Sequence, residues 1–167
     1  MPAPSVSRIV SGGQTGVDRA ALDVAIFLAI PHGGWCPRGR KAEDGSISSA
    51  YQLTETRASS YVVRTEKNVT DSDGTLILYR NRMSRGTALT ASLTRRHVRP
   101  CLAIDIAAMQ SGDSDGGWIG QRVEEIHAWL IQEGIETLNV AGPRESTSTG
   151  ITADAHTLLL NTFADIN

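Results

Sequence analysis

Residues 9–23 read IVSGGQTGVDRAALD, in which a short apolar stretch is followed by three glycines and then by a helix-like run. A strand that ends in glycines and continues into a helix leaves unpaired backbone N–H groups at the start of that helix. These N–H groups and the helix dipole favour a phosphate or another anion. The stretch therefore predicts a strand–turn–helix unit of an α/β fold, with an anion site at the turn.

Two alternatives remain for this turn. Its glycine spacing fits neither the P-loop nor the dinucleotide-binding fingerprint, so the glycines could serve only tight packing. Asp18 and Arg19 lie in the first turn of the predicted helix. They belong either to the anion site or to a solvated surface pair.

Length and composition indicate one globular domain. The chain has 167 residues, of which 40% are apolar and 20% charged. Its net charge of −2 gives no general attraction to nucleic acid. No stretch resembles a signal peptide or is long enough to span a membrane. Cys36 and Cys101 are too few for a disulfide scaffold and lack metal-ligand spacing, so we expect a cytoplasmic protein without nucleic-acid or membrane partners.

The remaining sequence alternates between strand-like and helix-like segments. Helices are predicted at residues 17–29, 87–97, 117–133 and 151–163, and an exposed loop at 110–117. Strands are predicted at residues 8–10, 60–64, 74–79, 101–106 and 137–141. The apolar run GTLILY at 74–79 is typical of a strand buried on both faces. This order predicts a single α/β domain with a parallel sheet flanked by helices.

Two further junctions combine glycine with arginine after a predicted strand. In a parallel sheet the carboxyl ends of the strands lie at one edge, so these junctions should converge with the first. Glycine turns and arginines at that edge would form a concave site for an anionic ligand. The residues concerned are Arg85, Gly86 and Thr87 in the first of them, and Gly142, Pro143, Arg144, Glu145 and Ser146 in the second.

Residues 32–48, HGGWCPRGRKAEDGSIS, are predicted to form a long loop, and such loops are usually functional or mobile. Trp35 could stack on a flat ligand ring or plug the edge of the core. Cys36 could bind a soft metal or be a structural thiol. The basic residues Arg38, Arg40 and Lys41 could attract an anion or form a solvated face.

Five motifs occur in a fixed order between about residues 9 and 151: SGGQTGVDRAALD, GGWCPRGRKAEDG, RTEKNVTDSDGTLIL, RGTALT and NVAGPRES. Together they resemble the putative molybdenum carrier proteins. These form the circularly permuted branch of the superfamily that contains the lysine-decarboxylase-like and cytokinin-activating phosphoribohydrolase proteins. The resemblance implies a Rossmann-like parallel sheet with helices on both faces, in one domain over residues 1–167 with a motif-bearing core at about 8–163.

The resemblance also implies a ligand and an assembly. The ligand would be molybdenum cofactor (molybdopterin), a pterin that carries a phosphate and a molybdenum centre, or a related phosphorylated, nucleotide-like molecule. The assembly would be a homo-oligomer, either a dimer or a tetramer.

The enzymatic relatives carry Pro-Gly-Gly-x-Gly-Thr-x-x-Glu after a buried strand. They also carry an arginine nine residues before an aspartate that precedes this strand. Arg64 stands nine residues before Asp73, and Gly86 and Thr87 match the Gly-Thr pair. The position of the glutamate, however, holds Thr90. Threonine cannot act as a carboxylate, so the resemblance implies that phosphate binding is retained and glycosidic hydrolysis is lost.

A nucleoside-phosphate N-glycosidase or related hydrolase and a nucleotide-sensing module remain alternatives. Other carboxylates could support hydrolysis in a different arrangement: Glu66, Asp71, Asp73 and Glu145. We expect no catalytic residue and no metal ligand. The expected ligand-binding residues are Gly12, Gly13, Thr15, Gly16, Arg19, Trp35, Arg64, Asn68, Arg85, Gly86, Thr87, Gly142, Pro143, Arg144, Glu145 and Ser146.

Overall fold

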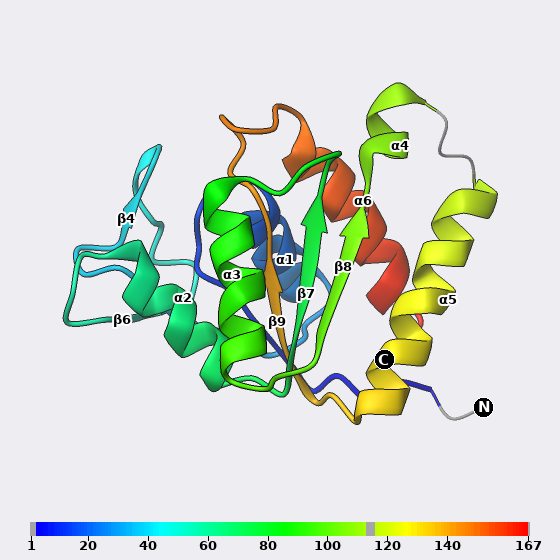
Figure 1. Ribbon diagram of the computed structural model, residues 1–167, viewed down its shortest axis with the longest axis horizontal. Helices are drawn as coiled ribbons and strands as arrows, with labels where there is room; N and C mark the ends of the chain where they lie inside the picture. The colour runs from blue at the N-terminus through cyan, green and yellow to red at the C-terminus, as the bar shows by residue number, and fades with distance from the viewer. Residues whose placement is uncertain (1–2, 113–115, 167) are drawn as a thin grey trace.

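A computed structural model describes residues 3–112 and 116–166. In this part of the chain five parallel strands form the central sheet, in the order β2-β1-β9-β7-β8. The last strand, β9, lies between β1 and β7, so the two ends of the sequence meet in the middle of the sheet (Figure 1). The strands are β1 (Arg8–Val10), β2 (His32–Gly33), β7 (Gly74–Tyr79), β8 (Cys101–Asp105) and β9 (Thr137–Ala141).

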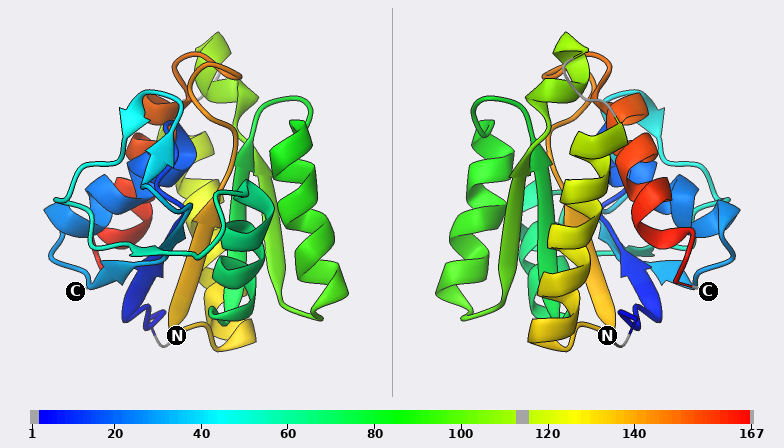
Figure 2. Two further views of the ribbon diagram at one scale, coloured as in Figure 1. Left: turned by 90° about the vertical axis from the view of Figure 1, so that its left-hand side faces the viewer. Right: turned by 90° about the vertical axis from the view of Figure 1, so that its right-hand side faces the viewer.

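Helices cover both faces of the sheet, which gives three layers (Figure 2). The helices α1 (Val17–Phe27), α5 (Gly116–Glu133) and α6 (Ile151–Phe163) pack on one face. The helices α2 (Tyr61–Thr70) and α3 (Arg85–Arg96) lie on the other, and the short α4 (Ala107–Ser111) follows β8. The main apolar core lies between the sheet and the first group, where Leu78, Val140 and Leu158 have no exposed surface.

The segment predicted as a long loop contains regular structure. Strand β3 (Trp35–Cys36) pairs with β6 (Thr54–Glu55). Strands β4 (Lys41–Ala42) and β5 (Gly45–Ser46) form a hairpin with Glu43 and Asp44 at its tip. A second, small core lies beneath the hairpin and consists of Cys36, Ala42 and Ile47, with Tyr51 and Leu53 packed against it.

Cys36 belongs to this small core rather than to a metal site. Burial raises the pKa of its thiol, which disfavours the thiolate that a metal would need. The structure thus favours the structural interpretation of this cysteine.

The predicted strand at residues 60–64 is wrong, because these residues lead into and form the first turn of α2. Ser60 caps the helix by accepting a hydrogen bond from the N–H of Val62. The buried side of α2 carries Arg64, Asn68 and Val69 at helical spacing. Two of these residues are polar, so a search for apolar periodicity does not detect the helix. The fifth strand of the sheet is instead β2, within the segment that was predicted as a loop.

The other predicted elements are confirmed within one or two residues at each end. The exposed loop predicted at residues 110–117 is wrong at both ends, because α4 extends to Ser111 and α5 begins at Gly116. Residues 113–115 of that prediction lie outside the described residues.

Candidate anion-binding site

A cavity opens at the carboxyl edge of the sheet, between α2, α3 and the β9–α6 loop (residues 142–150). Its volume is about 110 Å³, whereas one water molecule needs about 10–15 Å³ by the same measure, so it has room for a phosphate-sized group. Its lining residues are Gly12, Gln14, Asp18, Tyr61, Arg64, Thr65, Asn68, Ser84, Gly86, Thr87, Leu89, Thr90, Asn139, Val140, Ala141, Gly142, Pro143, Arg144 and Thr147.

The charged centre of the cavity is the pair formed by Arg64 and Asp18. Nη1 of Arg64 lies 3.3 Å from Oδ2 of Asp18, and both side chains are about nine-tenths buried. Burial raises the pKa of Asp18 above its usual value, although Arg64 acts in the opposite direction. Asp18 is therefore buried beside Arg64 and is not part of a solvated surface pair with Arg19.

Gly12 leaves the space that the guanidinium of Arg64 occupies. A Cβ atom on Gly12 would lie 1.6 Å from Nη1 of Arg64, which is far inside contact distance. Only a residue without a side chain lets the guanidinium lie over the end of β1. The first glycine of the opening motif is therefore explained by the close approach of a cation.

The first turn of α3 forms the opposite wall. Ser84 caps this helix by accepting a hydrogen bond from the N–H of Thr87. Gly86 lies in the first turn, and a Cβ atom there would have no heavy atom within 4 Å. The backbone at Gly86 is thus open to a ligand at the positive end of the helix dipole. Thr90 lies one turn further on and donates a hydrogen bond from Oγ1 to the carbonyl of Gly86.

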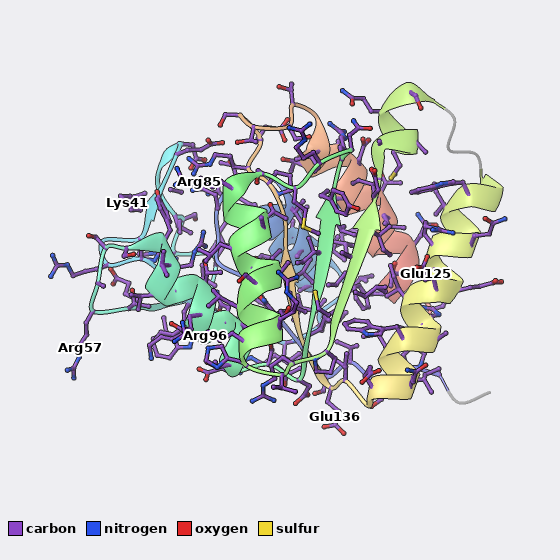
Figure 3. The ribbon with its side chains drawn as sticks, viewed as in Figure 1. Lys41, Arg57, Arg85, Arg96, Glu125 and Glu136 are labelled. Atoms are coloured by element: carbon purple, nitrogen blue, oxygen red, sulfur yellow. The ribbon has the colours of Figure 1, made fainter. Side chains whose placement is uncertain are left out.

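Three cationic side chains lie near the ring of Tyr61, at the rim of the cavity. The Nζ atom of Lys41 lies 4.9 Å from the centre of its ring. The guanidinium carbons of Arg64 and Arg144 lie 5.4 Å and 5.9 Å from the same centre. Figure 3 shows Lys41 on the hairpin and Arg85 at the start of α3, at the same end of the molecule, whereas Arg96 marks the far end of α3.

Within the β1–α1 turn (residues 11–16), the N–H groups of Ser11, Gln14 and Thr15 donate hydrogen bonds inside the protein. The N–H of Gln14 donates to Oδ2 of Asp18, and the N–H of Thr15 donates to Oε1 of Gln14. A Cβ atom on Gly16 would lie 2.2 Å from the carbonyl oxygen of Pro143, so this glycine lets the turn pack on the β9–α6 loop. Tight packing, the alternative interpretation of the glycines, thus accounts for Gly16.

The β9–α6 loop and the hairpin are joined through Glu43. Its carboxylate accepts hydrogen bonds from the hydroxyls of Thr15 and Ser146 and from the N–H of Ser146. Arg144 approaches the same carboxylate with Nη1 at 3.8 Å. Glu145 points the other way and accepts bonds from the N–H groups of Gly150 and Thr152, at the start of α6.

Two expected site residues have structural contacts elsewhere. Arg19 pairs with Asp44 at 2.6 Å and donates to the carbonyl of Gly13. Trp35 lines a different cavity with Arg8 and Asp71, where its indole N–H donates to Asp71 at 2.7 Å. The side-chain amide of Asn68 binds both the N–H and the carbonyl of Trp35, although Asn68 also lines the main cavity.

The structure brings half of the sequence-predicted residues to the cavity wall: Gly12, Arg64, Asn68, Gly86, Thr87, Gly142, Pro143 and Arg144. It does not place in that wall Gly13, Thr15, Gly16, Arg19, Trp35, Arg85, Glu145 and Ser146.

Sequence reasoning did not select Tyr61, Gln14 or Glu43. Tyr61 could have been found only through α2, because its place follows from the helix that begins there. Gln14 could have been selected from the sequence, because it lies between the glycines of the first motif.

The described residues contain no group of three or more histidine, cysteine, aspartate or glutamate side chains able to hold a metal ion. Within the same ranges, no helix has both the length and the apolar character needed to cross a membrane.

Taken together, these features define a Rossmann-like α/β protein with a basic cavity at the carboxyl edge of its parallel sheet. Residues 9–163 match the Circularly permutated YpsA SLOG family, and the chain belongs to this family.

A solved structure is closely similar: the putative molybdenum carrier protein from Syntrophus aciditrophicus SB. It is 43% identical, with a TM-score of 0.88, and the match covers 97% of each chain. A comparison with curated proteins gave no match. These findings confirm the family resemblance and the fold class predicted from the five motifs.

Proposed function

We propose that this protein binds a phosphorylated, nucleotide-like small molecule, with its phosphate between Arg64 and the first turn of α3. The observation that carries the proposal is a buried cation beside an open helix N-terminus. Arg64 is 9% exposed, and its Nε atom is without a hydrogen-bond partner among the described residues. Asp18 already lies beside the guanidinium, and a ligand oxygen would supply an acceptor for the donor that is left unused.

The charges around the cavity support an anionic ligand. Arg64 and Arg144 line it, and Asp18 is the single carboxylate among the lining residues. Lys41 adds a further cation at the rim, over Tyr61. A phosphate at the start of α3 would compensate this excess of positive charge and accept hydrogen bonds from the first-turn amides.

We propose molybdenum cofactor as the particular ligand. This step rests on what the family resemblance implies, and the similar solved structure is described as a putative molybdenum carrier. The residues present fit its phosphate, which Arg64, Gly86 and Thr87 would bind. When bound, this cofactor would supply a molybdenum centre carried by its pterin. The described residues offer no protein metal cluster, which is compatible with a metal held by the ligand itself.

Hydrolysis of an N-glycosidic bond is the second candidate, and it has weaker support. Thr90 lines the cavity where the enzymatic relatives are expected to hold glutamate. The other carboxylates considered from the sequence are bound elsewhere: Glu66 to His97, Asp71 to Trp35, Asp73 to backbone N–H groups, and Glu145 at α6. Asp18 is the carboxylate through which a hydrolytic step would have to operate.

Calorimetric titration with adenosine monophosphate and with adenosine tests the proposal. We expect the monophosphate to bind and adenosine to bind at least tenfold more weakly. Arg64→Ala should weaken monophosphate binding by about 1.5–3 kcal/mol, as expected for charged hydrogen bonds. Arg96→Ala removes the same charge at the far end of α3 and should leave binding unchanged (Figure 3). Equal losses in both variants, or equal binding of both compounds, would refute a phosphate site.

Two further measurements separate the finer claims. Native mass spectrometry with molybdenum analysis, on protein purified from its own host, tests the cofactor. Release of free adenine from the monophosphate, abolished by Arg64→Ala, would favour hydrolysis of the N-glycosidic bond over binding without turnover.

We also propose that the protein is a cytoplasmic homo-oligomer, a dimer or tetramer, without nucleic-acid or membrane partners. Light scattering coupled to gel filtration would test the assembly, and a monomer at micromolar concentration would refute it.

A further inference from the structure

The carboxylate of Glu43 lies among hydrogen-bond donors suited to an anion. It accepts bonds from the hydroxyls of Thr15 and Ser146 and from the N–H of Ser146 at 3.2 Å. Arg144 adds a positive charge at 3.8 Å. The side chain of Glu43 is only 18% exposed, although it belongs to the tip of a surface hairpin. The protein thus places one of its own anions in this group of donors.

These donors are held in place independently of Glu43. The N–H of Val17 donates to the carbonyl of Pro143 at 3.3 Å, and the N–H of Glu145 donates to Oγ1 of Thr15 at 3.2 Å. Both bonds tie the β1–α1 turn to the β9–α6 loop. The donor group would therefore keep its shape if the carboxylate of Glu43 turned away.

The base of the hairpin is also fixed, so only the Glu43 side chain needs to move. Arg40 donates hydrogen bonds to the carbonyls of Ile47, Ser48 and Tyr51. Ala42 is buried in the small core next to Glu43. Rotation of the Glu43 side chain alone would free the donors for another anion.

A second observation points to a ligand at this place. Gln14 is 7% exposed and lines the main cavity. Its Oε1 atom accepts from the N–H groups of Thr15 and Glu43, whereas its Nε2 atom is buried without a partner among the described residues. A buried amide donor without an acceptor is rare in proteins, and an acceptor atom of a ligand would satisfy it.

Arg144 connects this donor group to the main cavity. Its guanidinium lies 5.9 Å from the ring centre of Tyr61 and also approaches Glu43. The side chain is 43% exposed, so it has the freedom to follow a ligand. One molecule with two anionic groups could contact Arg64 with the first group and Arg144 with the second.

We propose that Thr15, Ser146 and Arg144 form a second oxyanion subsite, for which Glu43 competes as an internal anion. The ligand class is a compound with two oxyanion groups, such as a diphosphate or a phosphorylated molecule with a second tetrahedral oxyanion. This inference rests on the proposed function, because it extends the same cavity. Burial would raise the pKa of Glu43, but hydrogen bonds from Ser146 and Thr15 outweigh it and hold that pKa below its usual value, as expected where negative charge is favoured.

Glu43→Gln tests the subsite, because it removes the competing charge and keeps the shape of the side chain. The probes are pyrophosphate and adenosine monophosphate, titrated by calorimetry at constant pH and ionic strength. If Glu43 leaves the subsite open for about a tenth of the time, the variant should bind pyrophosphate about tenfold more tightly. Binding of the monophosphate, which has one phosphate, should change by less than about twofold.

Asp44→Asn is the matched control. It removes the same charge from the neighbouring position of the hairpin, but Asp44 pairs with Arg19 and not with the subsite. We expect no change in pyrophosphate affinity. An equal gain in both variants would mean a general charge effect and would overturn the subsite. Adding Ser146→Ala to Glu43→Gln should remove most of the gain, and circular dichroism would confirm that each variant is folded.

The outcomes separate this inference from the proposed function. If wild-type protein binds the monophosphate but Glu43→Gln gains nothing for pyrophosphate, the subsite is refuted and the proposed function stands. If no protein binds either probe, both are refuted. Molybdate as a third probe distinguishes the two sources of the oxyanion. A gain for pyrophosphate alone indicates a bridged diphosphate, and a gain for both indicates a subsite for tetrahedral oxyanions in general.

Discussion

Arg64 is the residue on which the site depends, and three neighbours determine its position. Gly12 leaves room for its guanidinium, Asp18 pairs with it at 3.3 Å, and the ring of Tyr61 lies 5.4 Å from its guanidinium carbon. The resemblance to the enzymatic relatives predicted Arg64 by its spacing from Asp73. The arrangement around it could not be predicted, because it depends on how α2 packs over the end of β1.

Gly12→Ala should displace Arg64, since the added methyl group would overlap Nη1. Separating the buried pair with Asp18 should cost about 3 kcal/mol of unfolding free energy and also weaken phosphate binding. Urea denaturation measures the first effect and calorimetric titration the second. Unchanged stability would show that the guanidinium can move without loss.

Gly86→Ala should separate binding from stability. The added methyl group meets no heavy atom within 4 Å, and alanine is the better helix former. We expect stability to stay the same or to rise by up to about 1 kcal/mol. Phosphate binding should weaken, because the methyl group covers the backbone at the first turn. Full affinity in this variant would place the phosphate elsewhere.

At the scale of elements, apolar patterning predicted four of the five strands of the main sheet (β1, β7, β8 and β9) and most of the long helices. The apolar run at 74–79 is continuous because β7 lies inside the sheet, so the bounds of this strand could be read from composition alone. Helix α2 was missed because Arg64 and Asn68 make its buried side polar. The error concealed Tyr61, which stands at the start of the helix.

The cap of α2 provides a test at this scale. Ser60→Ala removes the hydroxyl that accepts a hydrogen bond from the N–H of Val62. The variant should lose about 1 kcal/mol of stability, the usual value for a helix cap. Because Tyr61 and Arg64 lie in the first turns, phosphate binding should weaken as well. Ser60→Asp, which restores a cap, should recover both properties. If it recovers stability but not binding, the cap of α2 does not position the phosphate site.

For the whole molecule, carboxylates tie the loops of the carboxyl edge together. The hydrogen bond from Arg19 lowers the pKa of Asp44. Burial would raise the pKa of Glu145, but hydrogen bonds from Thr152 and Gly150 outweigh it and lower that pKa. A carboxylate with a lowered folded-state pKa stabilises the protein above its ordinary pKa and loses this effect as pH falls through the folded value.

Thermal stability should therefore fall as the pH drops below the ordinary pKa values of these groups, 4.5 for Glu145 and 3.8 for Asp44, because the unfolded chain then binds protons more readily than the folded protein. Glu145→Gln should lower the melting temperature at pH 7, and its difference from wild type should shrink toward pH 3. Asp18 has the opposite effect on stability. Its pKa is raised, so protonation of this carboxyl favours the folded protein as the pH falls. A difference between Glu145→Gln and wild type that is constant with pH would contradict a role for this charge.

The central claim is that a phosphate binds between Arg64 and the start of α3. The most direct measurement is a ¹H–¹⁵N NMR titration of the protein with inorganic phosphate, with chloride at equal ionic strength as the control. We predict saturable shifts of the backbone amides of Gly86 and Thr87 and of the Nε–H of Arg64, with the amides of the far end of α3 unchanged. Saturable shifts confined to residues outside the cavity, or none at millimolar phosphate, would contradict the claim.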